Sequence, residues 1–428
     1  MTSFTFYGIT EDRPSARWKA LFDSVWPAYR AWYLRDGDQA RPDLRTAESR
    51  LREHMPELVP TWQRLVDLAG GDETAARMLT LWNPPRFLPG CSQVALRAPE
   101  PALLRNYDYG LELFECVHSS TRYGSRRVIG TSDCLWGLLD GMNDDGLAVS
   151  LAFGGRPGDG DGFAAPLVVR FLLEVAGDVP EALRRLETIP VSMYYNLTMV
   201  DAKGTAVTAY VGPGMAPEVT EDPIATNHRG RQPEFPDHAR RFRSVERQDL
   251  LTGAVDQGGD VEEIAEAMLG QGVFSGDYDN AFGTLYTAVY RPLRGEVEYR
   301  WRSRSWTRTF TSTEEMIIVT LDDPTPDPVD LRPDRGSASD PENPATESAG
   351  AEPPRIATVA ELSATARGAV RDLAQSPDPA AFSALIDLST EVGEALGTSA
   401  RLLAEQNSWA RVAEIADVSR QAAWQRWR

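Results

Sequence analysis

The sequence predicts a layered α+β protein, because three patterns follow one another along its 428 residues. Between Ser15 and Leu81, apolar residues recur at intervals of three and four, the spacing of amphipathic helices. After Cys91, short β-like runs bounded by Gly, Asp or Pro dominate as far as residue 321. Runs of strands around pairs of helices are typical of layered α+β domains. The helical patterns that interrupt the β-like runs lie at residues 165–177, 179–189 and 261–270.

Changes in composition divide the chain into four parts. Pro84, Pro85, Pro89 and Gly90 stop the helical pattern and leave an extended stretch before Cys91. Residues 322–354 are rich in Pro, Asp, Ser and Glu and nearly free of large apolar residues, which predicts a disordered linker. The four predicted parts are a helical N-terminal segment at 1–90, which is a candidate propeptide, an α+β domain at 91–321, the linker at 322–354, and a small all-α domain at 355–428.

Composition limits the classes of protein to which the chain can belong. Its formal net charge of −19 argues against nucleic-acid binding along the whole length but leaves room for a small binding module at one end. The sequence shows neither a basic stretch followed by an apolar run nor a segment long enough to span a bilayer, so no targeting peptide and no membrane partner are expected. Three cysteines, at 91, 116 and 134, argue against a disulfide framework. These features favour a cytoplasmic protein.

Cys91 is the first candidate functional residue, since it follows Gly90 and opens a β-like run. A short hairpin returns a chain beside its own first strand, so Arg105 and Asp108 on the next run can reach the cysteine. A guanidinium beside a thiol favours the reactive thiolate, and a carboxylate can orient the attacking group. The alternative is that Arg105 and Asp108 form an ordinary ion pair at a strand end and that Cys91 is a buried packing residue.

The order of five short motifs adds to the catalytic interpretation. In this order the motifs resemble the acyl-coenzyme A:6-aminopenicillanic acid acyltransferase family, which is similar to the choloylglycine hydrolases and acid ceramidase-like amidases of the N-terminal nucleophile superfamily. The resemblance covers about residues 56 to 320. The five motifs are Gly90-Cys91, Arg105-x-x-Asp108, the turn-rich run Gly141–Leu147, the start of a strand pair at Asn196–Asp201, and Thr226-Asn227-His228.

The resemblance implies a four-layer αββα sandwich and a precursor that is cut between Gly90 and Cys91. It also implies that the Cys91 thiol attacks the carbonyl of an amide or thioester, with the freed α-amine as its general base. An α-amino group suits this role because its reference pKa is about 7.7 to 8.0. By the same resemblance, Arg105 and Asp108 would contact the nucleophile and its amine, and Asn227 would donate a hydrogen bond to the oxyanion.

Two features of the implied site stay open. The superfamily has a further active-site arginine, which should lie in or near residues 239–251, where Arg241, Arg243 and Arg247 are all candidates. A polar oxyanion partner found in bile-salt relatives is replaced here by Ala152 or a neighbour. A backbone amide would then supply that hydrogen bond.

Other polar residues have simpler interpretations. His228 could serve as a catalytic base, but a hydrogen bond within its loop is the better interpretation because the family uses its α-amine. Cys116 and Cys134 are interpreted as packing residues, and Asn143 and Asn196 as turn-forming residues. The four histidines lack the spacing of metal ligands, and no cofactor is expected.

The C-terminal end predicts two short helices within residues 408–428, with Ser419 placed to cap the second. The segment resembles bacterial helix-turn-helix units that end in Val-Ser-Arg-Gln-Ala-Ala. If residues 405–428 bind DNA, side chains of the second helix would face the major groove. The alternative is a helical packing or dimerisation unit, because residues 355–428 carry similar numbers of acids and bases. The candidate DNA-binding residues are Arg420, Gln421 and Gln425.

The main hypothesis is therefore a cysteine-dependent hydrolase or acyltransferase that acts on a small acyl substrate. DNA and a second copy of the chain are candidate partners. The alternative is a transcriptional regulator whose nucleophile-type fold senses a ligand. A thiol protease is less favoured, because the chain lacks a convincing Cys-His-Asn arrangement.

Overall fold

The computed structural model describes residues 2–87, 90–111, 114–278 and 282–321, together with residues 370, 374, 376, 381, 384, 388, 399 and 400. The chain divides into one compact unit at Met1–Arg332 and a second at Pro333–Arg428. The predicted linker at 322–354 and the predicted helix-turn-helix, with Arg420, Gln421 and Gln425, lie outside the described residues. The fold below is that of the first unit.

The larger of two sheets has nine strands. All neighbouring strands are antiparallel except β1 and β4, which are parallel. In spatial order the strands are β10 (Glu218–Thr220), β9 (Ala206–Val211), β8 (Tyr195–Asp201), β7 (Leu147–Phe153), β6 (Gly137–Asn143), β5 (Val128–Asp133), β4 (Val117–Thr121), β1 (Thr2–Glu11) and β16 (Glu315–Leu321).

The smaller sheet has seven strands and contains the β2–β3 hairpin that begins at Gly90. Its strands are antiparallel throughout. In spatial order they are β11 (Ile224–Ala225), β2 (Gly90–Leu96), β3 (Ala102–Tyr109), β13 (Phe282–Arg291), β14 (Glu296–Trp301) and β15 (Arg304–Thr309), and β12 (Gly276–Asp277) pairs with β13.

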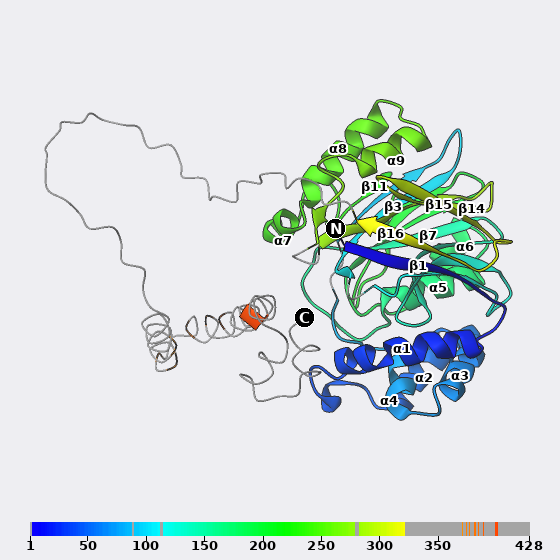
Figure 1. Cartoon of the computed structure of the whole chain (residues 1–428). Helices are drawn as coiled ribbons and strands as arrows, with labels where there is room; N and C mark the ends of the chain where they lie inside the picture. Colours follow the sequence, from blue (N-terminus) through cyan, green and yellow to red (C-terminus); the bar gives the residue numbers. More distant parts are fainter. Residues whose placement is uncertain are drawn as a thin grey trace, which may run out of the picture. The chain divides into compact units, whose positions relative to one another are not determined.

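Helices cover the outer faces of both sheets (Figure 1). One apolar core lies between the two sheets, a second lies under the helices that cover the nine-stranded sheet, and a third lies under those that cover the seven-stranded sheet. The prediction of a four-layer α+β sandwich is therefore confirmed for this unit. Within the described ranges, no helix is long and apolar enough to cross a membrane.

The two helical layers differ in size. On the nine-stranded sheet are α5 (Ala165–Val175) and α6 (Val179–Leu186), and on the seven-stranded sheet are α8 (Ser244–Asp256) and α9 (Val261–Leu269), preceded by the short α7 (Pro236–Arg241). The N-terminal helices share the core of α5 and α6. They are α1 (Ala16–Tyr33), α2 (Leu44–His54), α3 (Val59–Leu68) and α4 (Glu73–Leu79), with 3-10 turns at Asp38–Ala40 and Pro56–Leu58.

Strand β1 differs from the sequence expectation, which assigned residues 1–90 to a helical segment. The strand pairs with β16 on one side and β4 on the other. Phe6 of β1 is fully buried between the sheets, where its ring contacts the rings of Tyr299 and Trp301. The partner strand β16 lies about 300 residues away in sequence, so the pairing left no local signal.

Replacing Phe6 by Ala should lower the free energy of unfolding by about 3 to 5 kcal/mol, because the change leaves a cavity between the sheets. Urea denaturation of the full chain, followed by tryptophan fluorescence, measures this loss. Tyr7→Ala is the matched control, since the Tyr7 side chain on the same strand is 46% exposed. Equal losses in the two variants would contradict the placement of β1 in the core.

Candidate active site

Cys91 lies near the start of β2, and its side chain faces the core between the sheets. In the register of β2 and β3, Cys91 lies opposite Tyr107, and Gln93 lies opposite Arg105. Since side chains alternate between the faces of a strand, Cys91 and Arg105 share one face. Cys91 is fully buried. The hairpin predicted from the spacing of Cys91 and Arg105 is therefore present.

Asp108 lies opposite Gly90 and points to the other face of the hairpin, toward the helical layer. The residue at position 90 is packed tightly, because a Cβ atom there would lie 2.0 Å from Cε2 of Phe282. Glycine is therefore required if this ring is to cover the start of β2.

The Arg105 guanidinium contacts the Cys91 thiol directly. Its Nη2 donates to Cys91 Sγ at 3.1 Å, while its Nη1 donates to the carboxylate of Asp140 and to the hydroxyl of Tyr286, the latter at 3.2 Å. Burial lowers the pKa of Arg105, but Cys91, Tyr286 and Asp140 raise it more, so the guanidinium stays charged. Burial raises the pKa of the Cys91 thiol above its ordinary value, and the charge of Arg105 partly offsets this.

Arg247 contacts the other side of the same hairpin. Its Nη1 donates to the backbone carbonyl of Cys91 at 2.8 Å, to the Ser92 hydroxyl at 2.8 Å and to Asp108 Oδ2 at 3.2 Å. Thr284 donates to the second oxygen of Asp108 at 2.6 Å. Burial raises the pKa of the Asp108 carboxyl, whereas Arg247 and Thr284 oppose that rise. Arg247 therefore links Asp108 to the backbone carbonyl of Cys91.

A register shift between Thr284 and Tyr286 of β13 directs these two side chains to opposite faces of the hairpin. Thr284 lies opposite Asp108, and Tyr286 lies opposite Tyr107, with one extra residue between them. The bulge lets one strand hydrogen-bond Asp108 on one face and Arg105 on the other.

Asn227 holds the backbone nitrogen of Cys91. Its Oδ1 accepts from Cys91 N at 3.1 Å and from Arg247 Nη2 at 2.6 Å, and its Nδ2 donates to the carbonyl of Phe153 at 3.0 Å. These contacts fix the orientation of the amide. Asn227 therefore meets Cys91 as an acceptor, whereas the oxyanion role expected from the sequence requires a donor.

The loop that carries Asn227 is held by two polar side chains. Asn196 donates to the carbonyls of Thr226 and His228 at 2.8 and 2.9 Å, and the Ser244 hydroxyl accepts from Asn227 N at 2.8 Å. Gly155 has a φ of +72°, and a Cβ there would lie 2.0 Å from the carbonyl oxygen of Asn227. Asn196, expected to form a turn, instead fastens this loop to β8.

Among the three candidate arginines, the structure brings Arg247 to the hairpin. Arg241 is exposed at the end of α7, and Arg243 is half-buried in a left-handed conformation that precedes α8. Helix α8 carries no apolar stripe, because most of its buried residues are polar: Ser244, Arg247 and Gln248, together with Leu251. A helix that buries a polar face gives little sequence signal, which explains why neither α8 nor the choice of Arg247 was predicted.

The remaining residues from the sequence analysis lie away from the thiol. The ring nitrogens of His228 contact Ser244 and Gln248 at 2.6 and 3.0 Å, so His228 bonds within its loop environment. Cys134 Sγ contacts Asp133 at 3.6 Å, and Cys116 Sγ contacts a carbonyl two residues earlier. Ala152 is buried in the apolar core between the two sheets.

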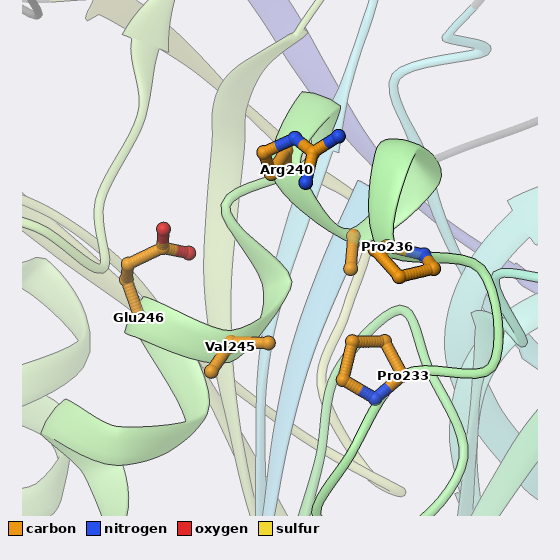
Figure 2. Close-up of a pocket in the computed structure, with 6 residues that line it drawn as sticks. Pro233, Pro236, Arg240, Val245 and Glu246 are labelled. Carbon is orange, nitrogen blue, oxygen red and sulfur yellow. The ribbon is translucent and has the colours of Figure 1, made fainter. Parts of the chain in front are cut away.

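A surface pocket of about 210 Å³ lies beside α7 and the start of α8. Figure 2 shows Pro233, Pro236 and Val245 around it. Neither Cys91 nor any of the residues that contact it lines this pocket. In the described part of the chain, no group of three His, Cys, Asp or Glu residues is arranged to hold a metal ion.

Two carboxyl groups meet at the N-terminal helix α1. The Tyr29 hydroxyl donates to Glu115 Oε1 at 2.6 Å and contacts Asp133 Oδ1 at 3.3 Å. The Ser132 hydroxyl and the Leu135 backbone N–H also donate to Glu115, at 2.7 and 2.6 Å. Burial, together with the neighbouring charge of Glu115, raises the pKa of Asp133 to about 7.

The geometry around Cys91 suits nucleophilic attack by sulfur. A guanidinium contacts the thiol, and an amide oxygen and a second guanidinium hold the backbone on either side of the Cys91 α-carbon. Charged donors next to a thiol stabilise the thiolate that acts as the nucleophile. One face of the hairpin thus brings a guanidinium to the sulfur, and contacts on the other face hold the main chain.

A sequence model of the acyl-coenzyme A:6-aminopenicillanic acid acyl-transferase family matches residues 97–306, slightly less than half of the chain. The match confirms the prediction of an enzyme of the hydrolase or acyltransferase class. No curated protein matches the sequence.

Several solved structures are similar at low identity. A mutant conjugated bile acid hydrolase from Clostridium perfringens is 12% identical, with a TM-score of 0.38 over 54% of this chain and 97% of that one. Penicillin V acylase from Agrobacterium tumefaciens is 15% identical, with a TM-score of 0.35 over 51% and 84%. The N-acylethanolamine-hydrolyzing acid amidase ortholog of Caenorhabditis elegans is 15% identical, with a TM-score of 0.35 over 47% and 92%.

Replacing Arg247 by Gln should lower the free energy of unfolding by about 3 to 5 kcal/mol, because Asp108 would lose its buried counterion. Urea denaturation measures the loss. Arg241→Gln removes the same charge from an exposed side chain and should change stability by no more than about 0.5 kcal/mol. A loss in Arg247→Gln as small as that of the control would contradict the ion pair.

Asp133→Asn should make thermal stability less dependent on pH. A carboxyl whose pKa is raised in the folded state binds its proton more tightly there than in the unfolded chain, so its contribution to stability falls as pH rises from about 4 to about 7. The free-energy difference between pH 5 and pH 8 should shrink in the variant, by no more than about 3 kcal/mol, because only the two pH units from 5 to the pKa of about 7 contribute. Melting temperatures at the two pH values test this.

Asp23→Asn is the control for this pH effect, because Asp23 on the same helix α1 is exposed. It should retain the pH dependence of the wild type. If Asp133→Asn retains it as well, Asp133 is ionised in the folded protein at both pH values and the raised pKa is wrong.

Proposed function

We propose that this chain is a cysteine-nucleophile amidohydrolase or acyltransferase that acts on an amide or thioester acyl group. The observation that carries the proposal is the contact of 3.1 Å between Arg105 Nη2 and Cys91 Sγ in a fully buried site. Asn227 and Arg247 support it, because they hold the nitrogen and the carbonyl of the same residue. The match to the acyl-transferase family supports the same class of reaction.

We further propose that the chain cuts itself between Gly90 and Cys91. The Cys91 thiol would attack the Gly90 carbonyl, so that a C–S bond forms, the C–N bond breaks and the Cys91 nitrogen takes up a proton. Water would then hydrolyse the thioester, which gives a Gly90 carboxylate and returns the thiol. The burial of both residues in the intact chain agrees with a precursor in which no substrate reaches the thiol.

In turnover, the freed α-amine of Cys91 would accept the thiol proton, and the thiolate would attack the acyl carbonyl of the substrate. The leaving amine or thiol would take the proton from the ammonium group, which leaves an acyl thioester on Cys91. Water or an acceptor amine would then release the acyl group. Asn227 Oδ1 already accepts from the Cys91 nitrogen and would orient the amine. Its role as an oxyanion donor stays a prediction.

The thiol chemistry fits a reducing compartment such as the cytoplasm, since all three cysteines are free. DNA binding through residues 405–428 and formation of a homodimer stay predictions from the sequence.

Intact mass spectrometry of the wild type beside Cys91→Ala tests self-cleavage. The wild type should yield two chains split between Gly90 and Cys91, and the variant should stay at 47.2 kDa. Cys134→Ala is the matched control, because it removes a buried thiol that does not contact Arg105. It should be cut like the wild type.

A wild type that stays intact would contradict self-cleavage, and cutting in Cys91→Ala would contradict the role of the thiol. The substrate class follows from two assays on the cut protein, release of nitroaniline from acyl nitroanilides and release of coenzyme A from acyl thioesters. Loss of both activities in Cys91→Ala is expected. Equal activity in that variant would overturn the proposed nucleophile.

A further inference from the structure

Asp140 of β6 lies at the centre of a buried polar cluster between the sheets. Its Oδ2 accepts from Arg105 and from the Tyr286 hydroxyl, the latter at 2.6 Å. Its Oδ1 accepts from the hydroxyls of Tyr290 and Thr131 at 2.5 and 2.9 Å. All five side chains are fully buried.

Every neighbour in this cluster donates to Asp140, which is the arrangement that an ionised carboxylate requires. Burial, together with the charge of Asp140, raises the pKa of Tyr286 and of Tyr290 well above the ordinary value, so both hydroxyls keep the protons that they donate. A buried charge without a partner is costly, and here the charge of Asp140 faces that of Arg105. The carboxylate therefore forms a buried ion pair that fixes the guanidinium.

The contacts of Arg105 connect Asp140 to the thiol. Nη1 is held by Asp140 and Tyr286, whereas Nη2 meets Cys91 Sγ. Nε of Arg105 has no hydrogen-bond partner among the described residues. The plane of a guanidinium is rigid, so fixing one arm sets the direction of the other.

We propose that Asp140 is a positioning residue, which holds one arm of the Arg105 guanidinium so that the other arm meets the Cys91 sulfur. The inference rests on the proposed function, in which Cys91 is the nucleophile. Arg105 interacts with both Asp140 and the thiol. The carboxylate therefore determines the direction of the guanidinium and how strongly its charge stabilises the sulfur. The contacts of Arg247 with the Cys91 carbonyl and with Asp108 do not involve Asp140.

Asp140→Asn tests the proposal, because the change keeps the shape of the side chain and removes its charge. Arg105 would then share its charge with no carboxylate and would stabilise the Cys91 thiolate more strongly, so the thiol should titrate at lower pH by half a unit or more. Cutting at Gly90–Cys91 and turnover by the cut protein should slow by about 100-fold, since the reacting group loses its alignment. The turnover number should fall more than the Michaelis constant changes.

Two readouts separate this inference from the proposed function. Titration of 13Cβ-labelled cysteine by NMR, with the Cys91 signal assigned from Cys91→Ala, reports the thiol without any need for activity. Rates of cutting and turnover report the chemistry. If the wild type is inactive but the titration shifts in Asp140→Asn, the proposed function fails and the coupling through Arg105 stands.

Asp201→Asn is the matched control. Asp201 is also a buried carboxylate, but it accepts from backbone N–H groups of Val179, Lys203 and Thr205 and does not contact Arg105. This variant should keep the titration and the rates of the wild type even if it is less stable. If Asp140→Asn cannot be distinguished from Asp201→Asn in both readouts, the positioning role is overturned.

Tyr290→Phe provides a second, milder variant in case Asp140→Asn does not fold. It removes one donor from Oδ1 of Asp140 and leaves the charge and the oxygen that faces Arg105 in place. Its titration should match the wild type, and its rates should fall by no more than about 5-fold, the loss of one hydrogen bond. A loss of rate as large as that expected for Asp140→Asn, with an unchanged titration, would contradict the assignment of the effect to the carboxylate charge.

Discussion

The antiparallel register of the β2–β3 hairpin is the constraint on which the rest of the site depends. With Cys91 opposite Tyr107, Arg105 falls on the face of the thiol and Asp108 on the opposite face. A slip of one residue would exchange the two faces and bring a carboxylate, rather than a guanidinium, to the sulfur. Two layers of the sandwich then complete the site, since the inter-sheet core supplies Asp140 and the outer helical layer supplies Arg247.

Burying two arginines so close together is energetically costly, and one buried carboxylate offsets the charge of each. Arg105 faces Asp140, and Arg247 faces Asp108. Further donors of Arg105 and Arg247 contact the Cys91 sulfur and two backbone carbonyls, respectively. A lysine offers one nitrogen and could not bridge partners on two sides in this way. The planar fork of arginine therefore suits a site in which one side chain contacts partners on two sides.

The sequence predicted those parts of the site that depend on neighbours in the chain. The hairpin brings Arg105 to the face of Cys91 across a short turn, as the spacing predicted. The same spacing placed Asp108 near the cysteine as well, whereas Asp108 lies on the opposite face. Asp140 and Tyr286 come from strands that meet the hairpin through tertiary pairing or across the core, and no local pattern connects them to it. Asp140 did carry one signal, because it is the single charged residue of a fully buried strand.

The described part of the N-terminal segment changes what a cut before Cys91 would produce. Strand β1 lies inside the nine-stranded sheet, between β4 and β16, and the helices after it share an apolar core with α5 and α6. Trp18 donates to the Leu135 carbonyl, and Trp136 donates to the Leu79 carbonyl, each at 2.9 Å. Removing the segment would open the sheet beside β4 and expose these contacts. A cut would therefore leave two chains bound in one fold, and the new amine would form beside Asn227 without loss of the scaffold that holds it.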